Sequence, residues 1–427
     1  MVRALTGISA LLLGVFAMNL GFSLQGTVLG VRASAEGFPV VMTGLIMSMY
    51  YLGYVGGSIY SPRLVNTVGH VRVFAALASL ASTSALLHAL FVLPVTWVVL
   101  RAMTGFCVAG LVVVAESWLN HASTNANRGS VLSIYMVVAL IASALGQLLL
   151  NAAPVDGFSL FILVSVLVSI SLVPIALTTQ SAPLLEPTTP MKVLRVFRLS
   201  PAGTMSCFAT GLVTGSFWGM GGVYALGIGL PIQSIAIFMA VAVLGGIISQ
   251  WPLGRLSDVI DRRAVLMGLG GAVAVSGLML AMADGLVPGG LQPWMLFALA
   301  ALYGAAVFPL YAISVAHVND VIDARDFVPA SSALLLIYAL GAMLGPFVAG
   351  AAMQVLGAPG LFYFSALVGL CLSAFAFNRL YFGATVSAED KETFTAMPKT
   401  SSQVYEMANT VAEHESQSDT DDKAPRP

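Results

Sequence analysis

Residues 254–263 read GRLSDVIDRR, and this stretch places five charged side chains between two long apolar runs. Charge is scarce elsewhere: 9% of the 427 residues are charged and 58% are hydrophobic. The mean hydropathy is +0.92. Because soluble domains carry about a quarter charged residues, the composition excludes a soluble protein and predicts one that lies within a lipid bilayer.

The apolar runs are long enough to cross a bilayer as helices. About 20 residues cover the hydrocarbon core, and only helices or closed barrels satisfy every backbone polar group there. A barrel would show short alternating segments, whereas these runs are continuous and contain the small residues that packed membrane helices need. We therefore expect twelve spans, at residues 4–31, 40–60, 72–93, 95–118, 129–151, 157–178, 203–225, 233–253, 264–283, 294–317, 329–353 and 358–382.

The first span has two features of a secretory signal, namely Arg3 before it and the sequence Ala33-Ser34-Ala35 after it. Its apolar stretch is longer than the roughly 7–15 residues of a signal core, so we expect it to remain as a helix. A cytoplasmic N-terminus places twelve Lys and Arg residues inside and only Arg32 outside. The excess of inner cations predicts that both termini are cytoplasmic.

Three pairs of identical residues are separated by nearly the same number of positions in the chain. Each pair joins a position of the first six spans to the matching position of the last six, at separations of 197, 199 and 199 residues: Gly57 and Gly254, Gly146 and Gly345, and Asn120 and Asn319. A fixed internal spacing indicates two homologous halves.

The repeat predicts four parts of the chain. Residues 1–182 and 201–382 are expected to form two six-helix bundles, joined by a cytoplasmic linker at 183–200. Residues 383–427 hold nine acids against four bases and few large apolar side chains. Such a segment cannot bury enough surface to fold alone, so we predict a disordered acidic cytoplasmic tail.

The stretch GRLSDVIDRR resembles a motif of the major facilitator superfamily, G-x-x-x-D-R-x-G-R-R, which follows the second and eighth helices. The first-half copy, GSIYSPRLVNTVGHVR from Gly57, departs from it, because Ser61 stands near the Asp position and the spacing is stretched. RAMTGFCVAG and ESWLN in the fourth span and GAMLGP in the eleventh resemble the bacterial YcaD-like subgroup. The resemblance covers residues 1–382 and implies an all-α integral membrane protein of the bacterial inner membrane, with twelve transmembrane helices in two pseudo-symmetric six-helix bundles.

The motif predicts a gate on the cytoplasmic side. Gly254 allows two helices to approach closely, and Asp258 can interact with the positive end of a neighbouring helix. Such contacts lie on one side of the membrane, so they can form in one conformation and break in another. Arg255, Arg262 and Arg263 can pair with Asp258, Asp261 or lipid phosphates. The alternative, open for Arg262 and Arg263, is that the cations only fix the topology.

In the eleventh span, Pro346 removes one helical hydrogen bond and predicts a hinge, although the small residues beside it also fit simple helix packing. The predicted gating residues are Gly57, Arg63, Gly69, Arg72, Gly254, Arg255, Asp258, Asp261, Arg262, Arg263, Gly341, Gly345 and Pro346.

Two ionisable residues within the spans are candidates for coupling, since charge inside a membrane is costly. Arg101 and Glu116 lie 15 residues apart, about 22 Å along a helix, so they cannot pair directly. Arg101 with Gly105 resembles the R-x-x-x-G motif of the superfamily, which implies proton coupling or contact with an anionic solute; pairing with a backbone carbonyl is the alternative. Glu116 is either a coupling carboxylate or a contact at a helix end.

Amides and aromatic side chains in the spans suit a planar, largely neutral organic solute, recognised by stacking and hydrogen bonds. Asn19 and Gln147 are the strongest candidates because they are amides near the middle of their spans, whereas Tyr and Trp near helix ends also form interfacial belts. The predicted binding residues are Asn19, Gln25, Tyr135, Gln147, Trp218, Tyr224, Tyr303, Tyr311, His317 and Tyr338.

These features predict a secondary transporter that imports a small organic solute together with protons, by alternating access, and riboflavin is an example of a fitting solute. Proton-coupled efflux is the alternative, but Gly146-Gln147 stands where drug antiporters of the superfamily have Gly-Pro. A sensor or scaffold that signals through the tail is the alternative from another class.

The chain has no phosphate-binding G-x-x-x-x-G-K-[ST] motif and no cluster with metal-ligand spacing, which argues against an ATP-driven pump and a metal site. We expect no enzymatic activity, no cofactor and no nucleic-acid partner. The expected partners are the solute, protons and membrane lipids, and the expected state is a monomer.

Overall fold

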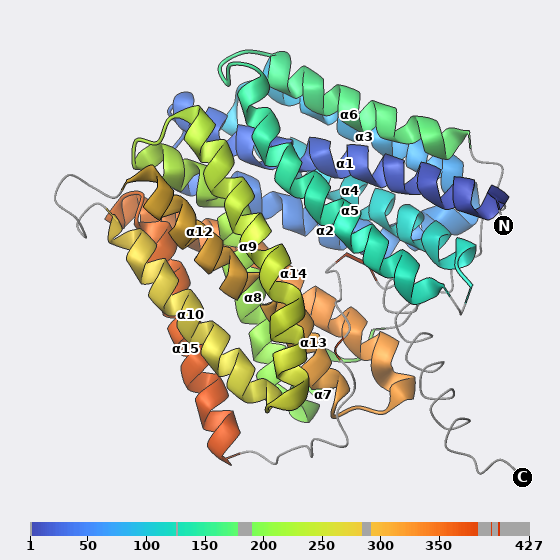
Figure 1. Cartoon of the computed structure of the whole chain (residues 1–427). Helices are drawn as coiled ribbons and strands as arrows, with labels where there is room; N and C mark the ends of the chain where they lie inside the picture. Colours follow the sequence, from blue (N-terminus) through green and yellow to red (C-terminus); the bar gives the residue numbers. More distant parts are fainter. Residues whose placement is uncertain are drawn as a thin grey trace, which may run out of the picture.

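The computed structural model describes residues 2–124, 127–177, 190–283 and 292–382, together with Phe394, Thr400 and Ser401. Within these residues the regular structure is helical, and the helices form two bundles that meet at an angle (Figure 1). Residues 183–189 of the predicted linker 183–200 and nearly all of the predicted tail 383–427 lie outside the described residues.

The first half contains one helix for each of the six predicted spans. α5 ends in a short 3₁₀ turn, η1 (Leu149–Ala152). The six helices are α1 (Val2–Ala35), α2 (Val40–Val68), α3 (His70–Leu90), α4 (Pro94–Ala122), α5 (Arg128–Leu148) and α6 (Ser159–Ala176).

The second half follows the short helix α7 (Val193–Leu199). A 3₁₀ turn, η2 (Ala324–Asp326), precedes α14. The helices of this half are α8 (Pro201–Gly227), α9 (Ile232–Val259), α10 (Arg262–Ala281), α12 (Pro293–Val307), α13 (Leu310–Asn319), α14 (Phe327–Leu356) and α15 (Gly360–Phe382).

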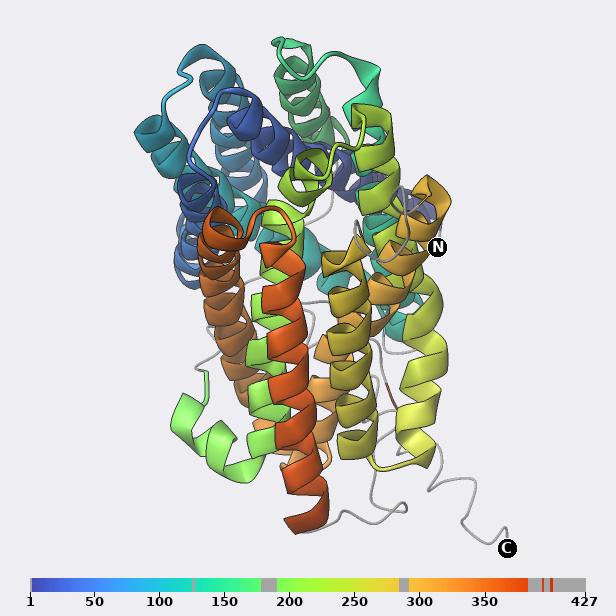
Figure 2. The ribbon, with the colours of Figure 1, turned by 90° about the vertical axis from the view of Figure 1, so that its left-hand side faces the viewer.

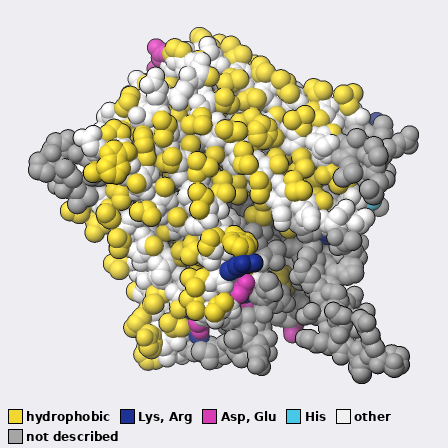
Figure 3. All heavy atoms as spheres, viewed as in Figure 1, with side chains coloured by type: hydrophobic (Ala, Val, Ile, Leu, Met, Phe, Trp, Pro, Cys, Tyr) yellow, Lys and Arg dark blue, Asp and Glu magenta, His cyan; other side chains and the backbone are white. Residues whose placement is uncertain are grey.

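The described residues contain eleven spans that are long and apolar enough to cross a membrane, with α12 and α13 counted together. The remaining predicted span, 203–225, is α8, which is rich in Gly, Ser and Thr. α8 packs against helices of both halves, α1, α2, α13, α14 and α15 among them, so most of its residues are buried away from lipid. Elsewhere the surface is apolar: Figure 3 shows hydrophobic side chains over most of one face, with a group of charged ones in its lower part.

The stretch GRLSDVIDRR is mostly helical, which corrects the prediction of a short loop. α9 continues to Val259, and α10 begins at Arg262. The boundary lies at Asp261, whose carboxylate accepts a hydrogen bond of 2.8 Å from the backbone N–H of Arg263 and caps α10. No Gly or Pro lies between Gly254 and this cap, so nothing in the stretch ends α9 earlier.

The tenth predicted span, 294–317, is broken into two helices, whereas the apolar run predicted one continuous helix. α12 ends at Val307 and α13 begins at Leu310, with Phe308 and Pro309 between them. Pro309 has no backbone N–H and its ring clashes with a continuing helix, so the break occurs at this residue.

Glycine contacts hold the helices of each half together. If Gly53 of α2 or Gly105 of α4 carried a Cβ, that atom would lie 1.9 Å from a backbone carbonyl oxygen of the other helix. Gly245 of α9 and Gly304 of α12 form the matching contact in the second half, with hypothetical Cβ distances of 2.1 and 1.8 Å. Small residues allow this approach, which dispersion and packing stabilise in a membrane where no hydrophobic force acts between helices.

A second matched pair of contacts follows the predicted repeat. A Cβ on Gly146 would lie 2.7 Å from the Leu20 carbonyl oxygen on α1, and a Cβ on Gly345 would lie 2.2 Å from the Leu212 carbonyl oxygen on α8. Each glycine therefore packs its helix on the first helix of its own half. The 199-residue offset between the two glycines corresponds to the same position in two related bundles.

The two halves meet closely at one end of the spans. We name the end at which α1 begins the N-terminal face and the other end the far face (Figure 2). Near the far face, a Cβ on Gly44 of α2 would lie 2.4 Å from the Pro346 carbonyl oxygen of α14, and a Cβ on Gly30 of α1 would lie 3.3 Å from the Gly219 carbonyl oxygen of α8. The far face is thus closed by backbone-to-backbone contact between the halves.

We expect Gly105→Ala to lower the melting temperature of the purified protein in detergent, because the added methyl group meets a backbone carbonyl that cannot move aside. Overpacking of this kind costs about 1–3 kcal/mol. Gly268→Ala on α10 is the matched control, since a Cβ there meets nothing within 4 Å, and the lost flexibility of glycine favours the variant by about 0.5–1 kcal/mol. Equal melting temperatures for the two variants would contradict the close contact.

Candidate functional site

A cavity lies between the two halves, at the level of the middle of the spans. Its larger lobe has a volume of about 250 Å³ and is lined by residues of α1, α2, α4, α5, α8 and α14. A smaller lobe of about 180 Å³ is lined by residues of α1, α4, α5, α9 and the α12–α13 break. The two lobes share Asn19, Val112, Ser143 and Thr400, so together they form one binding space.

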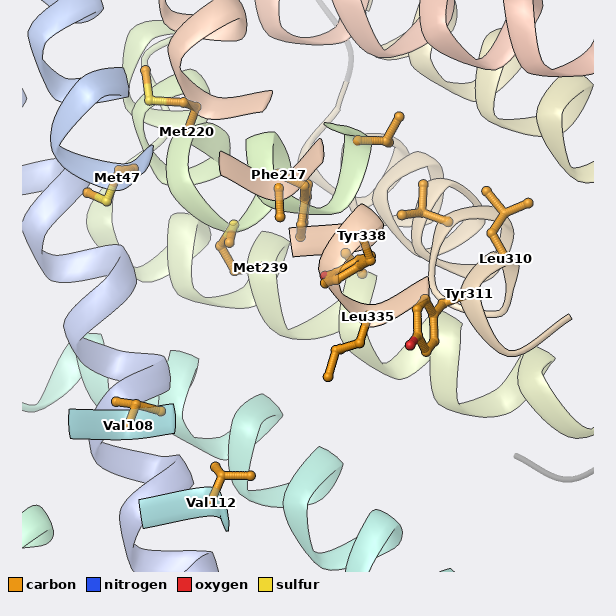
Figure 4. Close-up of a cluster of buried hydrophobic side chains, with 14 of the residues drawn as sticks. Met47, Val108, Val112, Phe217, Met220, Met239, Leu310, Tyr311, Leu335 and Tyr338 are labelled. Carbon is orange, nitrogen blue, oxygen red and sulfur yellow. The ribbon is translucent and has the colours of Figure 1, made fainter. Parts of the chain in front are cut away.

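The cavity has an apolar wall on each side. Figure 4 shows Val108 and Val112 on α4 facing Leu335, Tyr338 and Tyr311 across the space between the halves. Val108, Leu335 and Tyr338 line the larger lobe, and Tyr311 lines the smaller one. A small molecule in the cavity would therefore contact both halves.

Arg101 supplies a positive charge to the larger lobe. The glycine contact between α2 and α4 places Tyr50 beside it, with the guanidinium carbon 4.5 Å from the centre of the Tyr50 ring. Arg101 is only 6% exposed, and its Nε has no hydrogen-bond partner. The described residues include no ion pair to Arg101, and the face of the Tyr50 ring stabilises this buried charge.

Three tyrosines on α2 line the larger lobe, although none of them is among the binding residues predicted from the sequence. Tyr50, Tyr51 and Tyr54 line this lobe together with Trp218 of α8. The signal in the sequence was the pair Tyr50 and Tyr54, four residues apart and on one side of a helix. Gly53 beside them brings this part of α2 against α4.

The predicted amides have different roles in the structure. Asn19 lines both lobes and donates a hydrogen bond of 2.9 Å to the Val15 carbonyl oxygen. Gln25 lines the larger lobe, and neither polar atom of its side chain has a partner. Gln147 does not line the cavity: its amide donates to the Ser23 hydroxyl oxygen at 2.7 Å and accepts from the Thr27 hydroxyl at 2.5 Å, which ties α5 to α1.

The remaining predicted binding residues divide into two groups. Tyr135 and Tyr311 line the smaller lobe, and Trp218 and Tyr338 line the larger one. The other three line neither lobe: Tyr224 donates to the Leu280 carbonyl oxygen at 2.7 Å, Tyr303 donates to the Ser365 hydroxyl oxygen at 3.0 Å, and His317 lies in the last turn of α13.

Glu116 is fully buried on α4. Its carboxylate accepts a hydrogen bond of 2.6 Å from the Tyr135 hydroxyl and another from the Ser401 hydroxyl. No ion pair joins Glu116 to Arg101 or to any other described residue. Because Tyr135 lines the smaller lobe, its hydroxyl connects the carboxylate to the cavity.

The charged residues of GRLSDVIDRR form a network at the N-terminal face of the second half. The buried Arg262 pairs with the equally buried Asp320 at 2.8 Å and with Asp258 at 3.2 Å. Arg263 pairs with Asp261 at 2.8 Å and donates to the Arg379 carbonyl oxygen at 2.8 Å. The network therefore joins the ends of α9, α10 and α15 to Asp320, which directly follows α13.

Asp261 and Arg255 complete this region. Burial raises the pKa of the Asp261 carboxyl, but the hydrogen bonds and the positive charge of Arg263 outweigh it, and the pKa lies below its usual value. Arg255 stays exposed and stacks on Trp251, with its guanidinium carbon 3.9 Å from the ring centre.

The first half has no matching network among its described residues. A Cβ on Gly57 would lie 2.4 Å from the Phe106 carbonyl oxygen, so Gly57 holds α2 against α4. Gly69 ends α2 with a φ of 95°, which glycine adopts without strain. Arg63 and Arg72 are exposed.

The predicted hinge residues of α14 lie in packed helix contacts. A Cβ on Gly341 would lie 2.3 Å from the Phe208 carbonyl oxygen of α8. Gly345 packs on the same helix, while Pro346 lies at the junction with α2 near the far face.

We expect Arg262→Gln to destabilise the protein strongly, because Asp320 would remain buried with its main cation removed. Breaking a buried pair in this way costs about 3–5 kcal/mol. Thermal unfolding in detergent measures the effect. Arg255→Gln, at an exposed position seven residues earlier and without an ion pair among the described residues, is the matched control and should unfold at the wild-type temperature. An Arg262→Gln variant as stable as this control would contradict the assigned role.

Comparisons with known proteins agree with this architecture. The chain is 29% identical over 347 residues to an uncharacterized MFS-type transporter of Enterobacter sp., covering 81% of this chain and 88% of the relative. It is 28% identical over 346 residues, with the same coverage, to the uncharacterized MFS-type transporter YcaD of Escherichia fergusonii. The relatives are transporters of the YcaD-like type that the sequence motifs predicted.

Solved structures show the same fold at low sequence identity. A D323A mutant of the nucleoside transporter NupG superposes with a TM-score of 0.73 at 14% identity, covering 87% of this chain and 99% of that one. A bacterial homologue of the human lysosomal transporter Spinster, in an inward-facing and unoccupied conformation, gives 0.67 at 15% identity, covering 91% and 98%. The sequence profile of the Major Facilitator Superfamily matches residues 11–292 and 205–408, and the chain belongs to this superfamily.

Proposed function

We propose that the protein is a secondary active transporter that moves a small organic solute across the bacterial inner membrane by alternating access. The observation that carries this proposal is the cavity at the middle of the spans, where residues of both halves surround one buried cation. Movement of one half against the other would expose such a site to each side of the membrane in turn.

The distribution of cations supports a cytoplasmic N-terminal face. Twelve Lys and Arg residues fall on that side in the predicted topology, against Arg32 on the other, and cytoplasmic loops carry this excess. In this orientation the close contacts of Gly44 with Pro346 and of Gly30 with Gly219 seal the outer side. Opening to the outside requires these contacts to separate. We propose that a single chain suffices, because both halves of the site come from one chain.

The lining supports a planar aromatic solute that also carries a negative or strongly hydrogen-bond-accepting group. Tyr50, Tyr51 and Trp218 offer ring faces for stacking. The Nε of Arg101 and both polar atoms of the Gln25 amide lack hydrogen-bond partners. The N–H groups of these two side chains are donors to which a solute acceptor could bind. This proposal refines the expectation of a largely neutral solute, because Arg101 lies in the cavity wall. A flavin-like vitamin or a nucleoside combines a planar ring system with acceptor oxygens.

Coupling to protons is proposed to run through Glu116. A carboxyl group inside a membrane span gains and loses a proton at a lower cost than a charge that must stay fixed there. The Tyr135 hydroxyl lies between Glu116 and the smaller lobe, which provides a path for a proton between the carboxyl group and the solute space. Import with protons follows if the solute and the proton are released together on the cytoplasmic side.

Uptake into energised membrane vesicles tests the transport proposal. We expect accumulation of one class from a panel of flavins, nucleosides, aromatic acids, sugars and cationic dyes. Arg101→Ala should reduce that accumulation at least ten-fold, the loss expected when one hydrogen bond of about 1.5–3 kcal/mol to a charged group is removed. Arg101→Lys keeps the charge and should retain part of the activity, and Arg63→Ala, which changes an exposed arginine, should retain all of it. Extrusion of the dyes instead would contradict import.

Glu116→Gln separates coupling from binding. We expect the variant to lose accumulation driven by a proton gradient, because an amide cannot carry the proton, while exchange of labelled for unlabelled solute continues. Tyr135→Phe, which removes only the hydroxyl, should slow accumulation less. Gradient-driven accumulation at the wild-type level in Glu116→Gln would rule out this carboxyl as the coupling group.

A further inference from the structure

Three described residues that follow α15 in the chain, Phe394, Thr400 and Ser401, lie between the two halves at the N-terminal face. Ser401 is buried, and its hydroxyl donates to the Glu116 carboxylate of the first half. The Tyr54 hydroxyl, also of the first half, donates to the Thr400 carbonyl oxygen at 2.9 Å. These contacts join positions 285 and 346 residues apart in the chain.

Phe394 makes the corresponding contacts with the second half. Its backbone N–H donates to the Asp258 carboxylate at 3.0 Å. Its ring lies against Gly254, where a Cβ would be 2.2 Å from the ring Cδ1. Only glycine at position 254 leaves room for this ring, so the motif GRLSDVIDRR provides part of the contact surface.

Thr400 also lines both lobes of the cavity. A segment that contacts Glu116 and Tyr54 on one half and Asp258 on the other occupies the path between the cavity and the N-terminal face. Bridging contacts of this kind also oppose the approach of the two halves at that face, which alternating access requires.

We propose that the segment of the chain carrying Phe394, Thr400 and Ser401 is an internal ligand of the transporter, which binds at the N-terminal end of the cavity and inhibits transport until it is released. The chemistry of the surface fits a peptide: the Glu116 and Asp258 carboxylates accept from a hydroxyl and a backbone N–H, the Tyr54 hydroxyl donates to a carbonyl, and Gly254 receives an aromatic ring.

Ser401→Glu in the full chain tests the proposal without altering the residues of the cavity wall. It replaces a donor to the Glu116 carboxylate with a second carboxylate, and like charges at this distance repel. Ser418→Glu adds the same charge 17 positions farther along the chain, outside the described residues, and is the matched control.

The first measurement is structural and does not depend on transport. With p-benzoylphenylalanine at position 394, irradiation of native membranes should cross-link that residue to the part of α9 around Gly254, as mapped by mass spectrometry. Ser401→Glu should reduce the cross-link roughly ten-fold, the effect of losing one hydrogen bond to a charged group, and Ser418→Glu should leave it unchanged. No cross-link to α9 in the wild-type background would overturn the proposed binding of the segment.

The second measurement is the initial rate of solute uptake and rests on the proposed function. Release of the segment should raise the rate by roughly ten-fold in Ser401→Glu, in line with the same lost hydrogen bond, and Phe394→Ala should raise it as well. A cross-link that Ser401→Glu abolishes without any rise in the uptake rate would overturn the inhibitory role. Absence of uptake in every variant, with the cross-link intact, would count against the proposed transport function and leave the binding of the segment supported.

Discussion

Backbone contact through glycine is the constraint on which the rest of this structure depends. In hydrocarbon, helices gain nothing from hiding apolar side chains from one another, so close packing must hold them together. The contact of Gly53 and Gly105 in the first half recurs at Gly245 and Gly304 in the second. The same contact sets the site, because it fixes the height at which the Tyr50 ring meets the Arg101 guanidinium on the neighbouring helix.

The two halves share this packing but differ in their charges. At the N-terminal face, the second half holds a buried network built on Arg262 and Asp320, whereas the matching first-half arginines Arg63 and Arg72 are exposed. Ser61, at the position where the motif has an acid, is buried and its hydroxyl has no partner. At this face the adjacent arginines Arg262 and Arg263 therefore join four segments of the second half, whereas the described residues of the first half have no such network.

The sequence predicted the fold far better than the site. Long apolar runs fixed the number of spans, and the 199-residue offset of Gly146 and Gly345 corresponds to equivalent contacts in the two bundles. Periodicity could not show where helices extend beyond the hydrocarbon, so the stretch after Gly254 was expected to be a loop. The hydrogen-bond partners of polar side chains could not be predicted from the sequence. Gln147 and Tyr303 were expected to bind the solute, but they bond to Ser23 and Ser365, which are distant in the chain. Tyr50 was overlooked because its importance arises only from the α2–α4 contact.

Because of the break at Phe308 and Pro309, the two parts of the tenth span pack on different helices. α12 packs mainly on α9, whereas α13 packs mainly on α8, and Asp320 at its end is held by the arginine of α10. Prolines also lie inside α2, α6, α9 and α14 without interrupting them, but at Pro309 one helix has ended and another begins. The break therefore lies beside the smaller lobe that Phe308 and Tyr311 line. A change in the angle between α12 and α13 would alter the wall of that lobe without bending a continuous helix.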